Sequence, residues 1–496
     1  MNQINLSSFE NKIIQSILTD DLEKARFFLN QSTDSHKLLL DLLKKVENRP
    51  VPLNFLKIKY PSIIHIPTSF TCQIGCKMCN AGFNDRTSIY SNRNYLLPEE
   101  FDNFKPWIET ATHINLVGIG ETLESPYIPD LLKKITKKVS MITTSGVPLN
   151  KKKVGLFIEL GLKYLNLSFD GNTTLGHGGG KLSYTKMFWK KVDMIQEVKR
   201  ELGSKFPILL LNVSINSENI DNLDELLSVA HKKKISYVDL VAMFPINTET
   251  LNKSIFPDLD KSLKKINKVI SIWRTNGLNV TVSEKEEMKK TLDSCHFIDN
   301  YLIFNTPTPA PHPCCGPLDF PLDYPSMSKE IFWNSFPFRY LRYLHYFGEQ
   351  ENWPMVCQTC NLVSLKHFAK SADTKFFNKE NNAKAYDLYR SISKLKNEKL
   401  YKKAEKGFLK ILNLESDFAL KGKIYFQLGL LKLVDNQYED SLSFMKLAVG
   451  YYFTHGMAFA YLYLLSMFLE EPESGTPVRP TRETYMEKIS KANGLI

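Results

Sequence analysis

Six short apolar runs alternate with longer amphipathic segments in the first half of the chain, and this alternation constrains the fold more than any other feature. The runs have the composition of buried strands, and the segments between them have helical spacing. Strands that alternate with helices form parallel βαβ units with right-handed crossovers. The sequence therefore predicts an α/β fold, a full or partial (β/α)6 barrel with helices on one side of its sheet. The predicted strands are residues 63–66, 114–117, 139–144, 164–169, 208–215 and 237–243.

Polar segments follow the first four predicted strands. Three cysteines come after the first strand, and Gly120 and Glu121 come after the second. Residues 143–146 end the third strand, and Ser168 and Asp170 end the fourth. Functional groups of parallel α/β folds lie at the carboxyl ends of the strands and in the loops that follow. We therefore expect these four segments to lie at one mouth of the sheet.

Cys72, Cys76 and Cys79 form a C-x3-C-x2-C motif in the first of these segments. Three thiolates leave one iron of a cubane cluster open to a substrate, whereas a structural zinc site uses four protein ligands. The alternative is a zinc knuckle completed by His65 or by a distant cysteine. All eight cysteines fall into two groups, and residues 1–10 do not have the pattern of a secretory signal. This usage indicates metal centres in a reducing compartment, so we expect a cytoplasmic protein.

The three-cysteine motif and the segments after it resemble the radical S-adenosylmethionine superfamily over about residues 60 to 285. The resemblance implies a [4Fe-4S] cluster on the three cysteines, with S-adenosyl-L-methionine chelating the open iron. It also implies one-electron cleavage of that cofactor to methionine and a 5'-deoxyadenosyl radical, which abstracts a hydrogen atom from a substrate. The electron would come from a donor such as flavodoxin or ferredoxin.

The resemblance also assigns cofactor-binding roles to residues at the strand ends. The family often has Gly-Gly-Glu-Pro after the second strand, and this chain has Ile119 and Thr122 at two of those positions. A Ser-x-Asp segment at a strand end is also common in turns and helix caps. No catalytic acid or base is identified from the sequence. The implied residues are Met78 near the adenine, Gly120 and Glu121 at the methionine amino group, Ser168 and Asp170 at the carboxylate or ribose, and Val241 and Ala242 bracketing the adenine.

A glycine-rich loop, residues 175–181, follows the fourth predicted strand. It is not a phosphate-binding P-loop, because the first glycine of that pattern and the Ser or Thr after its lysine are missing. It could be a mobile lid over the substrate or a flexible loop without a function. His177 and Tyr184 are near the strand ends in sequence, and we expect both to be ordinary surface residues.

The second cysteine group comprises five thiols, more than one cluster can use. It resembles the SPASM and twitch modules, which implies one auxiliary [4Fe-4S] cluster, since a two-cluster SPASM module needs more cysteines. A zinc site with the same ligands is the alternative, because C-x2-C pairs also suit zinc. The sequence does not choose between the two adjacent cysteines. The five are Cys295, Cys314, Cys315, Cys357 and Cys360.

Lysine-rich helical segments begin at about residue 380. The pattern from Tyr401 to Phe408 recurs 37 residues later, from Tyr438 to Met445. This offset is close to the 34-residue tetratricopeptide period. The sequence predicts four parts: an N-terminal helical segment (1–55), a radical S-adenosylmethionine core (56–290), an auxiliary-cluster module (291–375) and a tetratricopeptide-like helical domain (376–496).

The formal charge of +11 is distributed in short lysine runs near predicted helix ends. Such runs indicate a solvated surface, so we expect no nucleic-acid partner. The longest apolar stretch, residues 457–469, is shorter than the roughly 20 residues that span a bilayer, and we expect no membrane association.

Family members with auxiliary modules commonly modify peptides, and stacked helix pairs create concave surfaces suited to extended peptides. The preferred function is therefore radical modification of a peptide or protein side chain. The alternatives are modification or oxidation of a small molecule such as a sugar or alcohol, and a metal-stapled interaction scaffold without turnover. The sequence does not determine the substrate, the hydrogen abstracted, the reaction outcome or the oligomeric state.

Overall fold

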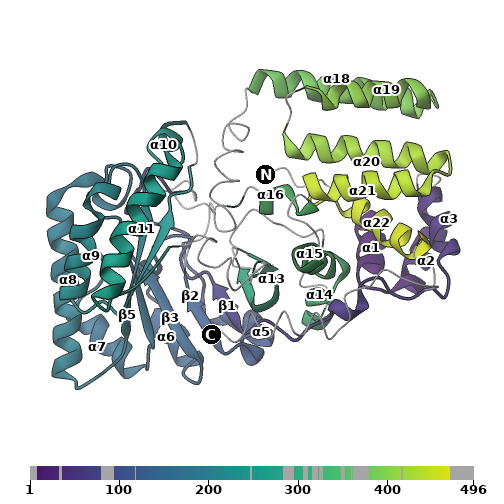
Figure 1. Cartoon of the computed structure of the whole chain (residues 1–496). Coiled ribbons are helices and arrows are strands. Elements are labelled where there is room, and N and C mark those ends of the chain that lie inside the picture. The colour runs from purple at the N-terminus through teal and green to yellow at the C-terminus, as the bar shows by residue number, and fades with distance from the viewer. Residues whose placement is uncertain are drawn as a thin grey trace.

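A computed structural model of the chain shows a lobe built on a parallel sheet and a lobe built from helices (Figure 1). Helices α13 (Phe297–Asn300), α14 (Lys329–Trp333), α15 (Phe336–Phe347) and α16 (Met355–Gln358) lie between them. The structure describes residues 8–32, 36–79, 94–117, 119–245, 248–282, 295, 297–304, 311–314, 322, 328–347, 352–358, 360, 379–414 and 417–469.

The described strands form one sheet in the order β7-β6-β5-β4-β3-β2-β1-β8-β9. Every neighbouring pair is parallel except β8 and β9. The six predicted strands pair in chain order, so the predicted α/β fold is confirmed. The order is linear, as expected of a partial barrel. The strands are β1 (Ile63–Ile66), β2 (His113–Leu116), β3 (Val139–Thr144), β4 (Tyr164–Ser168), β5 (Ile208–Ile215), β6 (Tyr237–Ala242), β7 (Asn279–Val282), β8 (Tyr301–Phe304) and β9 (Pro311–His312).

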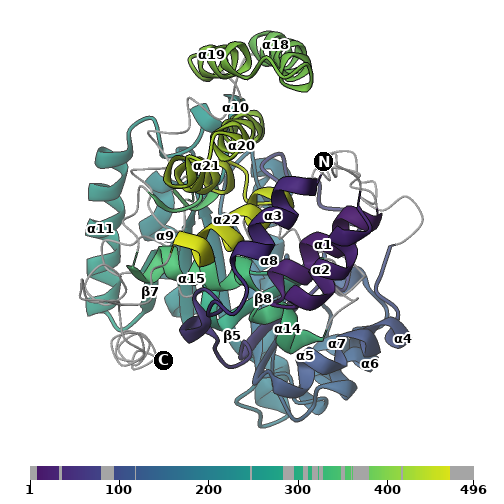
Figure 2. The same cartoon turned by 90° about the vertical axis from the view of Figure 1, so that its right-hand side faces the viewer.

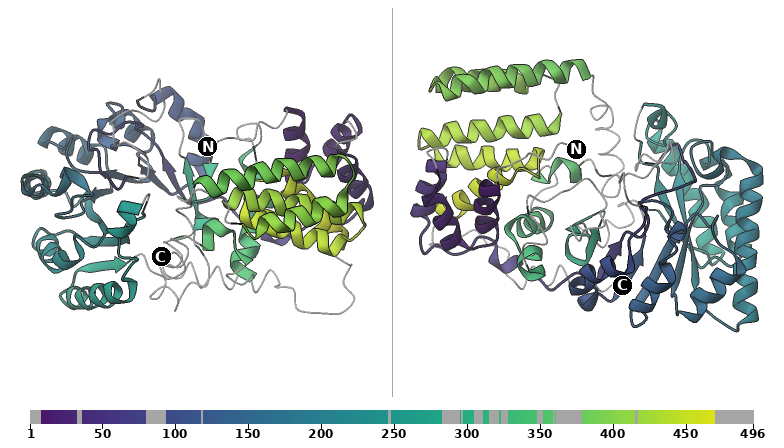
Figure 3. Two further views of the ribbon diagram at one scale, coloured as in Figure 1. Left: turned by 90° about the horizontal axis from the view of Figure 1, so that it is seen from above. Right: turned by 180° about the vertical axis from the view of Figure 1, so that it is seen from behind.

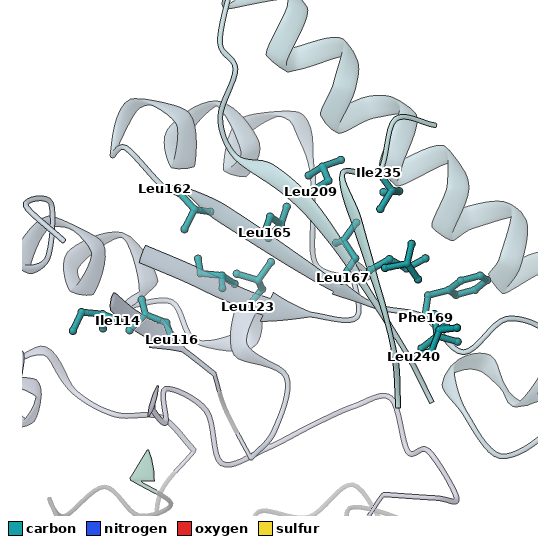
Figure 4. Close-up of a cluster of buried hydrophobic side chains, with 14 of the residues drawn as sticks. Ile114, Leu116, Leu123, Leu162, Leu165, Leu167, Phe169, Leu209, Ile235 and Leu240 are labelled. Carbon is teal, nitrogen blue, oxygen red and sulfur yellow. The ribbon is translucent and has the colours of Figure 1, made fainter. Parts of the chain in front are cut away.

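Amphipathic helices connect these strands and cover one side of the sheet (Figure 1). In α8, the buried residues Phe188, Val192, Ile195 and Val198 recur every three or four positions and face the core. Leucine and isoleucine side chains from neighbouring strands meet this layer in a continuous cluster (Figure 4). The connecting helices are α4 (Pro98–Phe101), η4 (Asp102–Phe104), α5 (Lys105–Thr110), η5 (Thr122–Glu124), α6 (Ile128–Lys134), α7 (Lys151–Glu159), η6 (His177–Gly180), α8 (Leu182–Glu201), η7 (Ile220–Asn222), α9 (Leu223–Lys232), α10 (Thr248–Asn252) and α11 (Leu259–Thr275).

The first and last described helices share one hydrophobic core. Helices α1 (Ser8–Leu18), α2 (Leu22–Asn30) and α3 (Lys37–Lys45), with the short η2 (Asn54–Leu56), pack with α15 and with α22 (Gly456–Leu469). Figure 2 shows α22 beside α1 and α3. Segments more than 400 residues apart in sequence are therefore parts of one packed unit.

A buried ion pair joins the same elements. Arg339 on α15 is fully buried, and its two terminal nitrogens donate to the two carboxylate oxygens of Asp20 at 2.7 and 2.8 Å. Tyr463 on α22 also donates to Asp20, at 3.1 Å. The turn between α1 and α2 is thus held by both later helices.

The remaining helices form successive antiparallel hairpins that stack in layers (Figure 3). They are α18 (Lys379–Asn397), α19 (Tyr401–Leu412), α20 (Phe418–Val434) and α21 (Tyr438–Tyr451). Both copies of the sequence repeat begin a helix, and Phe408 and Met445 are buried at matching positions. No helix in the described part of the chain is long and apolar enough to cross a membrane.

Candidate functional site

The three-cysteine loop begins directly after β1, at the carboxyl edge of the sheet. Cys72, Cys76 and Cys79 are half-buried, and none of the cysteines in the described ranges forms a disulfide. The backbone N–H of Cys79 donates to the carbonyl of Cys76 at 3.1 Å, which closes a turn between the second and third cysteines. The predicted ligand trio therefore lies on one compact loop.

The loop after β2 holds the first half of the three-cysteine loop through backbone contacts. The N–H of Gly120 donates to the carbonyl of Ser69 at 3.1 Å, and the N–H of Glu121 donates to that of Thr71 at 3.0 Å. A Cβ atom on Gly120 would lie 2.0 Å from the Thr71 carbonyl oxygen. Only glycine allows the two backbones to approach this closely. The predicted glycine therefore has a steric role beside the first cysteine.

The carboxylate of Glu121 is buried and fully engaged within the protein. One oxygen accepts from the hydroxyl of Thr144 at 2.5 Å and from the N–H of Leu123 at 3.0 Å. The other accepts from the hydroxyl of Ser145 at 2.6 Å and from its N–H at 2.8 Å. The side chain therefore ties the loop after β2 to the end of β3, and the predicted contact between Glu121 and the methionine amino group stays a prediction.

Glu124, which the sequence analysis did not single out, has a free acceptor beside the same loop. One of its oxygens accepts from the N–H of Gln73 at 2.9 Å. Its other oxygen is buried and has no hydrogen-bond partner in the described ranges. The pKa of Glu124 is raised overall. Burial raises it most and the charge of Glu121 adds to this, while the hydrogen bond from the Gln73 N–H opposes the shift. A buried acceptor without a donor suits a ligand that carries one.

The thiol of Cys72 lies in an environment that disfavours an isolated thiolate. Burial raises its pKa to about 11; a hydrogen bond from the Ile74 backbone opposes this, and the charges of Glu121, Cys76 and Glu124 add to it. Bound iron would offset these negative charges, so the residues present fit an iron–sulfur cluster.

A preformed zinc site is not visible at this position. Within the described ranges, no three His, Cys, Asp or Glu side chains meet as ligands of one metal ion. Nε2 of His65 lies 2.6 Å from the side-chain amide of Asn115, and its ring packs against Tyr301 in the sheet. His65 is therefore engaged by neighbouring strands.

The end of β4 lies at the same edge of the sheet. Ser168 pairs in register with Asn212 of β5, and Asp170 is buried. Asp170 accepts from the N–H of Ser214 at 2.9 Å and from Nδ1 of His177 at 3.0 Å. Both of its oxygens thus have partners inside the protein, and the cofactor contacts predicted for Ser168 and Asp170 remain predictions.

His177 and Tyr184 are not ordinary surface residues, contrary to expectation. The side chain of His177 is 15% exposed, and its ring lies parallel to that of Tyr184 with centroids 6.0 Å apart. Burial lowers the pKa of His177, but hydrogen bonds to Asp170 and to the Cys76 side chain outweigh this and raise it well above its usual value. In the sequence, His177 is marked only by its position seven residues after Asp170. This spacing is insufficient to predict the contact between the two side chains.

A pocket of about 490 Å³ opens between the three-cysteine loop and the glycine-rich loop. Its walls include Ile74 and Lys77 from the first loop, Lys181 from the second, and Tyr184 at the start of α8. Met78 lies within the same stretch of the first loop. The predicted adenine-side residues Val241 and Ala242 end β6, with Ala242 in register with Ile215 of β5.

The second cysteine group converges on Cys357 of α16. Burial raises the pKa of Cys357 well above its usual value, and the charges of Cys314, Cys295 and Cys360 raise it further. Cys295 and Cys314 come from two earlier segments, and Cys360 follows Cys357 by three residues, so three segments contribute thiols that act on Cys357. Cys315 lies outside the described residues. Cys314, Cys357 and Cys360 also pack against the core shared by α15 and α22.

No protein-family model matches the chain. Among solved structures, it is similar to Streptococcus suis SuiB bound to the precursor peptide SuiA, at 14% identity and a TM-score of 0.44, over 60% of this chain and 69% of SuiB. It is similar to SuiB bound to S-adenosylmethionine at 17% identity and a TM-score of 0.40, over 62% and 71% of the two chains. It is similar to anSMEcpe with bound AdoMet at 16% identity and a TM-score of 0.41, over 55% and 77%. The parallel sheet with the three-cysteine loop after β1 has the arrangement that the sequence predicts.

Proposed function

We propose that the chain is a radical S-adenosylmethionine enzyme that modifies a peptide or protein side chain. The observation that carries this proposal is the three-cysteine loop at the carboxyl edge of a parallel sheet, with the backbone of Gly120 against it and an unpaired buried oxygen of Glu124 beside it. A cluster on three thiolates with one open iron, bound by a ligand that carries an ammonium group, would account for all three features.

Cys72, Cys76 and Cys79 would hold the [4Fe-4S] cluster in this proposal. When bound, the cluster supplies one electron, received from a donor such as flavodoxin or ferredoxin, to split S-adenosylmethionine into methionine and the 5'-deoxyadenosyl radical. The chain's own residues position and shield the reactants. Gly120 permits close backbone approach, and Glu124 offers an acceptor to a donor such as the methionine ammonium.

Cys295, Cys357, Cys360 and one of the adjacent Cys314 and Cys315 would hold one auxiliary cluster. The charges of Cys314, Cys295 and Cys360 raise the pKa of Cys357, which supports a shared site for this group. Two groups of metal-binding thiols suit a reducing compartment, so we place the protein in the cytoplasm.

A peptide substrate is supported by the hairpin array that follows the auxiliary cysteines. Lys423 on α20 lies 5.6 Å from the ring centroid of Tyr386 on α18 and 6.0 Å from that of Tyr452. A cation between two aromatic rings on stacked helices is a surface that suits an extended peptide with an acidic or apolar residue.

Anaerobic reconstitution followed by an assay for 5'-deoxyadenosine with dithionite tests the enzyme. We expect release of 5'-deoxyadenosine by the reconstituted chain and none by Cys76→Ala. Absence of the product from a protein with full iron content would refute the enzyme and favour the interaction scaffold.

The substrate class is tested by stimulation of the same assay. A size-fractionated peptide pool should increase 5'-deoxyadenosine release, and a panel of sugars and alcohols should not. Lys423→Glu should weaken the stimulation, whereas Lys446→Glu, on the exposed side of α21, should not. Stimulation by a sugar or alcohol alone would favour the small-molecule alternative.

A further inference from the structure

The glycine-rich loop between β4 and α8 is bonded directly to the second half of the three-cysteine loop. The backbone N–H of Met78 donates to the carbonyl of Leu175 at 3.2 Å, and Leu175 is fully buried. The cysteine loop is therefore held on one half by the loop after β2 and on the other by the loop after β4.

The first anchor of this glycine-rich loop is the contact between His177 and Asp170. The two side-chain atoms are 3.0 Å apart, and Asp170 is itself fixed by the N–H of Ser214 on β5. On its other side the ring of His177 stacks on Tyr184, whose hydroxyl donates to the carbonyl of Ser145 at 3.3 Å. The imidazole is thus held between Asp170, two residues after β4, and Tyr184 on α8.

The second anchor is Glu218, which follows β5. Its carboxylate accepts from the N–H of Thr174 at 2.7 Å and from the hydroxyls of Thr173 and Thr174 at 2.9 and 2.7 Å. Lys253 on the adjoining turn lies 3.1 Å from the same carboxylate. Each of these bonds involves a charged group, and charge-assisted hydrogen bonds are the stronger class. The chain is therefore attached at residues 173 and 174, just before the glycine-rich loop, as well as at His177 in the loop.

The glycines of the loop serve close packing and tight turning. A Cβ atom on Gly176 would lie 2.5 Å from the carboxylate oxygen of Asp170 that His177 contacts. Gly179 and Gly180 have φ values of 57° and 76°, a conformation that other residues rarely adopt. These positions require glycine in the anchored conformation, so the glycine content does not by itself indicate a moving lid.

We propose that residues 173–181 form a fixed brace that holds the Cys76–Cys79 half of the cysteine loop in its cluster-binding shape, with His177 and Glu218 as its positioning residues. The brace itself is inferred from contacts within the chain, whereas its effect on a bound cluster rests on the proposed function. The first of two measurements tests the brace in the iron-free protein, and the second tests its effect on the cluster.

The first measurement needs no cluster. Hydrogen–deuterium exchange is followed in the iron-free full chain for the peptide that spans residues 72–79. His177→Phe keeps a ring to stack on Tyr184 but cannot bond to Asp170, and Glu218→Gln removes the charge at the other anchor. Both should accelerate exchange of this peptide by at least roughly tenfold, the factor associated with one hydrogen bond to a charged group.

The matched control is Glu197→Gln on α8. It removes an exposed carboxylate that lies 2.8 Å from the side-chain nitrogen of Lys151 on α7. It should leave exchange of the cysteine loop unchanged. Thr174→Val is a milder test, for use if the His177 or Glu218 variant does not fold. It removes the Thr174 hydroxyl that donates to Glu218, and exchange should accelerate less than in those variants. Unchanged exchange of residues 72–79 in the folded His177 and Glu218 variants would overturn the brace.

The second measurement uses the reconstituted protein. Only a cluster with an open iron binds S-adenosylmethionine. The component of the reduced-cluster EPR signal that shifts when S-adenosylmethionine is added therefore comes from the cluster on the three-cysteine loop. Both brace variants should lose this part faster than the wild type in the presence of an iron chelator, while the unresponsive part decays at the wild-type rate. Equal decay of both parts would contradict the brace. A wild type that never shows a responsive signal, with accelerated exchange in the variants, would refute the proposed function and leave the brace standing.

Discussion

Glu121→Gln is the substitution whose effect the structure defines most closely. The native carboxylate accepts four hydrogen bonds, two on each oxygen, from Thr144, Leu123 and Ser145. Glutamine has nearly the same shape but replaces one acceptor oxygen with an NH2 group. The substitution therefore changes hydrogen bonding at a buried position with little change in volume.

The loss of folding stability in Glu121→Gln depends on which hydrogen-bond donors lose their acceptor. If the new nitrogen faces Ser145, the serine hydroxyl can rotate to accept, but the backbone N–H of Ser145 loses its partner. If it faces Thr144, the threonine hydroxyl can rotate, but the N–H of Leu123 loses its partner. Either orientation leaves one buried backbone donor unsatisfied, at about 1–3 kcal/mol. Loss of charge assistance in the remaining bonds adds to this, so we expect destabilisation of roughly 2–4 kcal/mol.

Equilibrium urea unfolding followed by circular dichroism and tryptophan fluorescence measures this loss. Glu124→Gln is the matched control in the same loop, because it can keep the bond from Gln73 and removes a charge that burial disfavours. We expect its stability to remain within about 0.5 kcal/mol of the wild type. A Glu121→Gln protein as stable as the control would refute the hydrogen-bond accounting at Glu121.

Three further predictions concern other contacts. Gly120→Ala places a Cβ atom 2.0 Å from the Thr71 carbonyl oxygen, so reconstituted protein should bind less iron at the three-cysteine loop; unchanged iron content and EPR would contradict this. Asp20→Asn leaves Arg339 as a buried charge without its counter-ion, so thermal unfolding should show a loss of about 3–5 kcal/mol, and a loss under about 1 kcal/mol would be inconsistent with the pair's burial. Burial lowers the pKa of His65 to about 4, so the unfolded chain binds a proton first as the pH falls from about 6.5. Stability should therefore decrease between about pH 6.5 and 4, by no more than about 3 kcal/mol from this residue, and His65→Gln should remove that part of the slope in unfolding experiments at several pH values.

The strands and the position of the cysteine motif could be predicted from the sequence because both depend on local patterns. Apolar runs of strand length, separated by helical periods, specify the order of the sheet. Both copies of the Tyr401–Phe408 pattern begin a helix for the same reason, since buried positions recur with the helical period.

The partners of charged and polar residues could not be predicted in the same way. His177 looked like a surface residue because its contacts with Asp170 and Tyr184 depend on how the loop after β4 folds back. Glu124 followed the predicted motif by three residues, and nothing in its sequence position indicated that one of its oxygens is buried without a donor. Asp20 and Arg339 are 319 positions apart, so only packing of α15 against the turn between α1 and α2 brings them together.

The sequence by itself determined the parallel sheet and the three-cysteine loop at its carboxyl edge, because strand periodicity and thiol spacing are local properties of the chain. The tertiary structure alone decided how that loop is held. The backbone of Gly120 lies against Thr71 because the neighbouring strands β1 and β2 place their following loops side by side. Leu175 accepts from Met78 because the loop after β4, two strands further along, folds back over the same edge of the sheet. The cysteines specify which atoms can bind iron, and the packing of the loops after β2 and β4 specifies the shape in which the cysteine loop presents them.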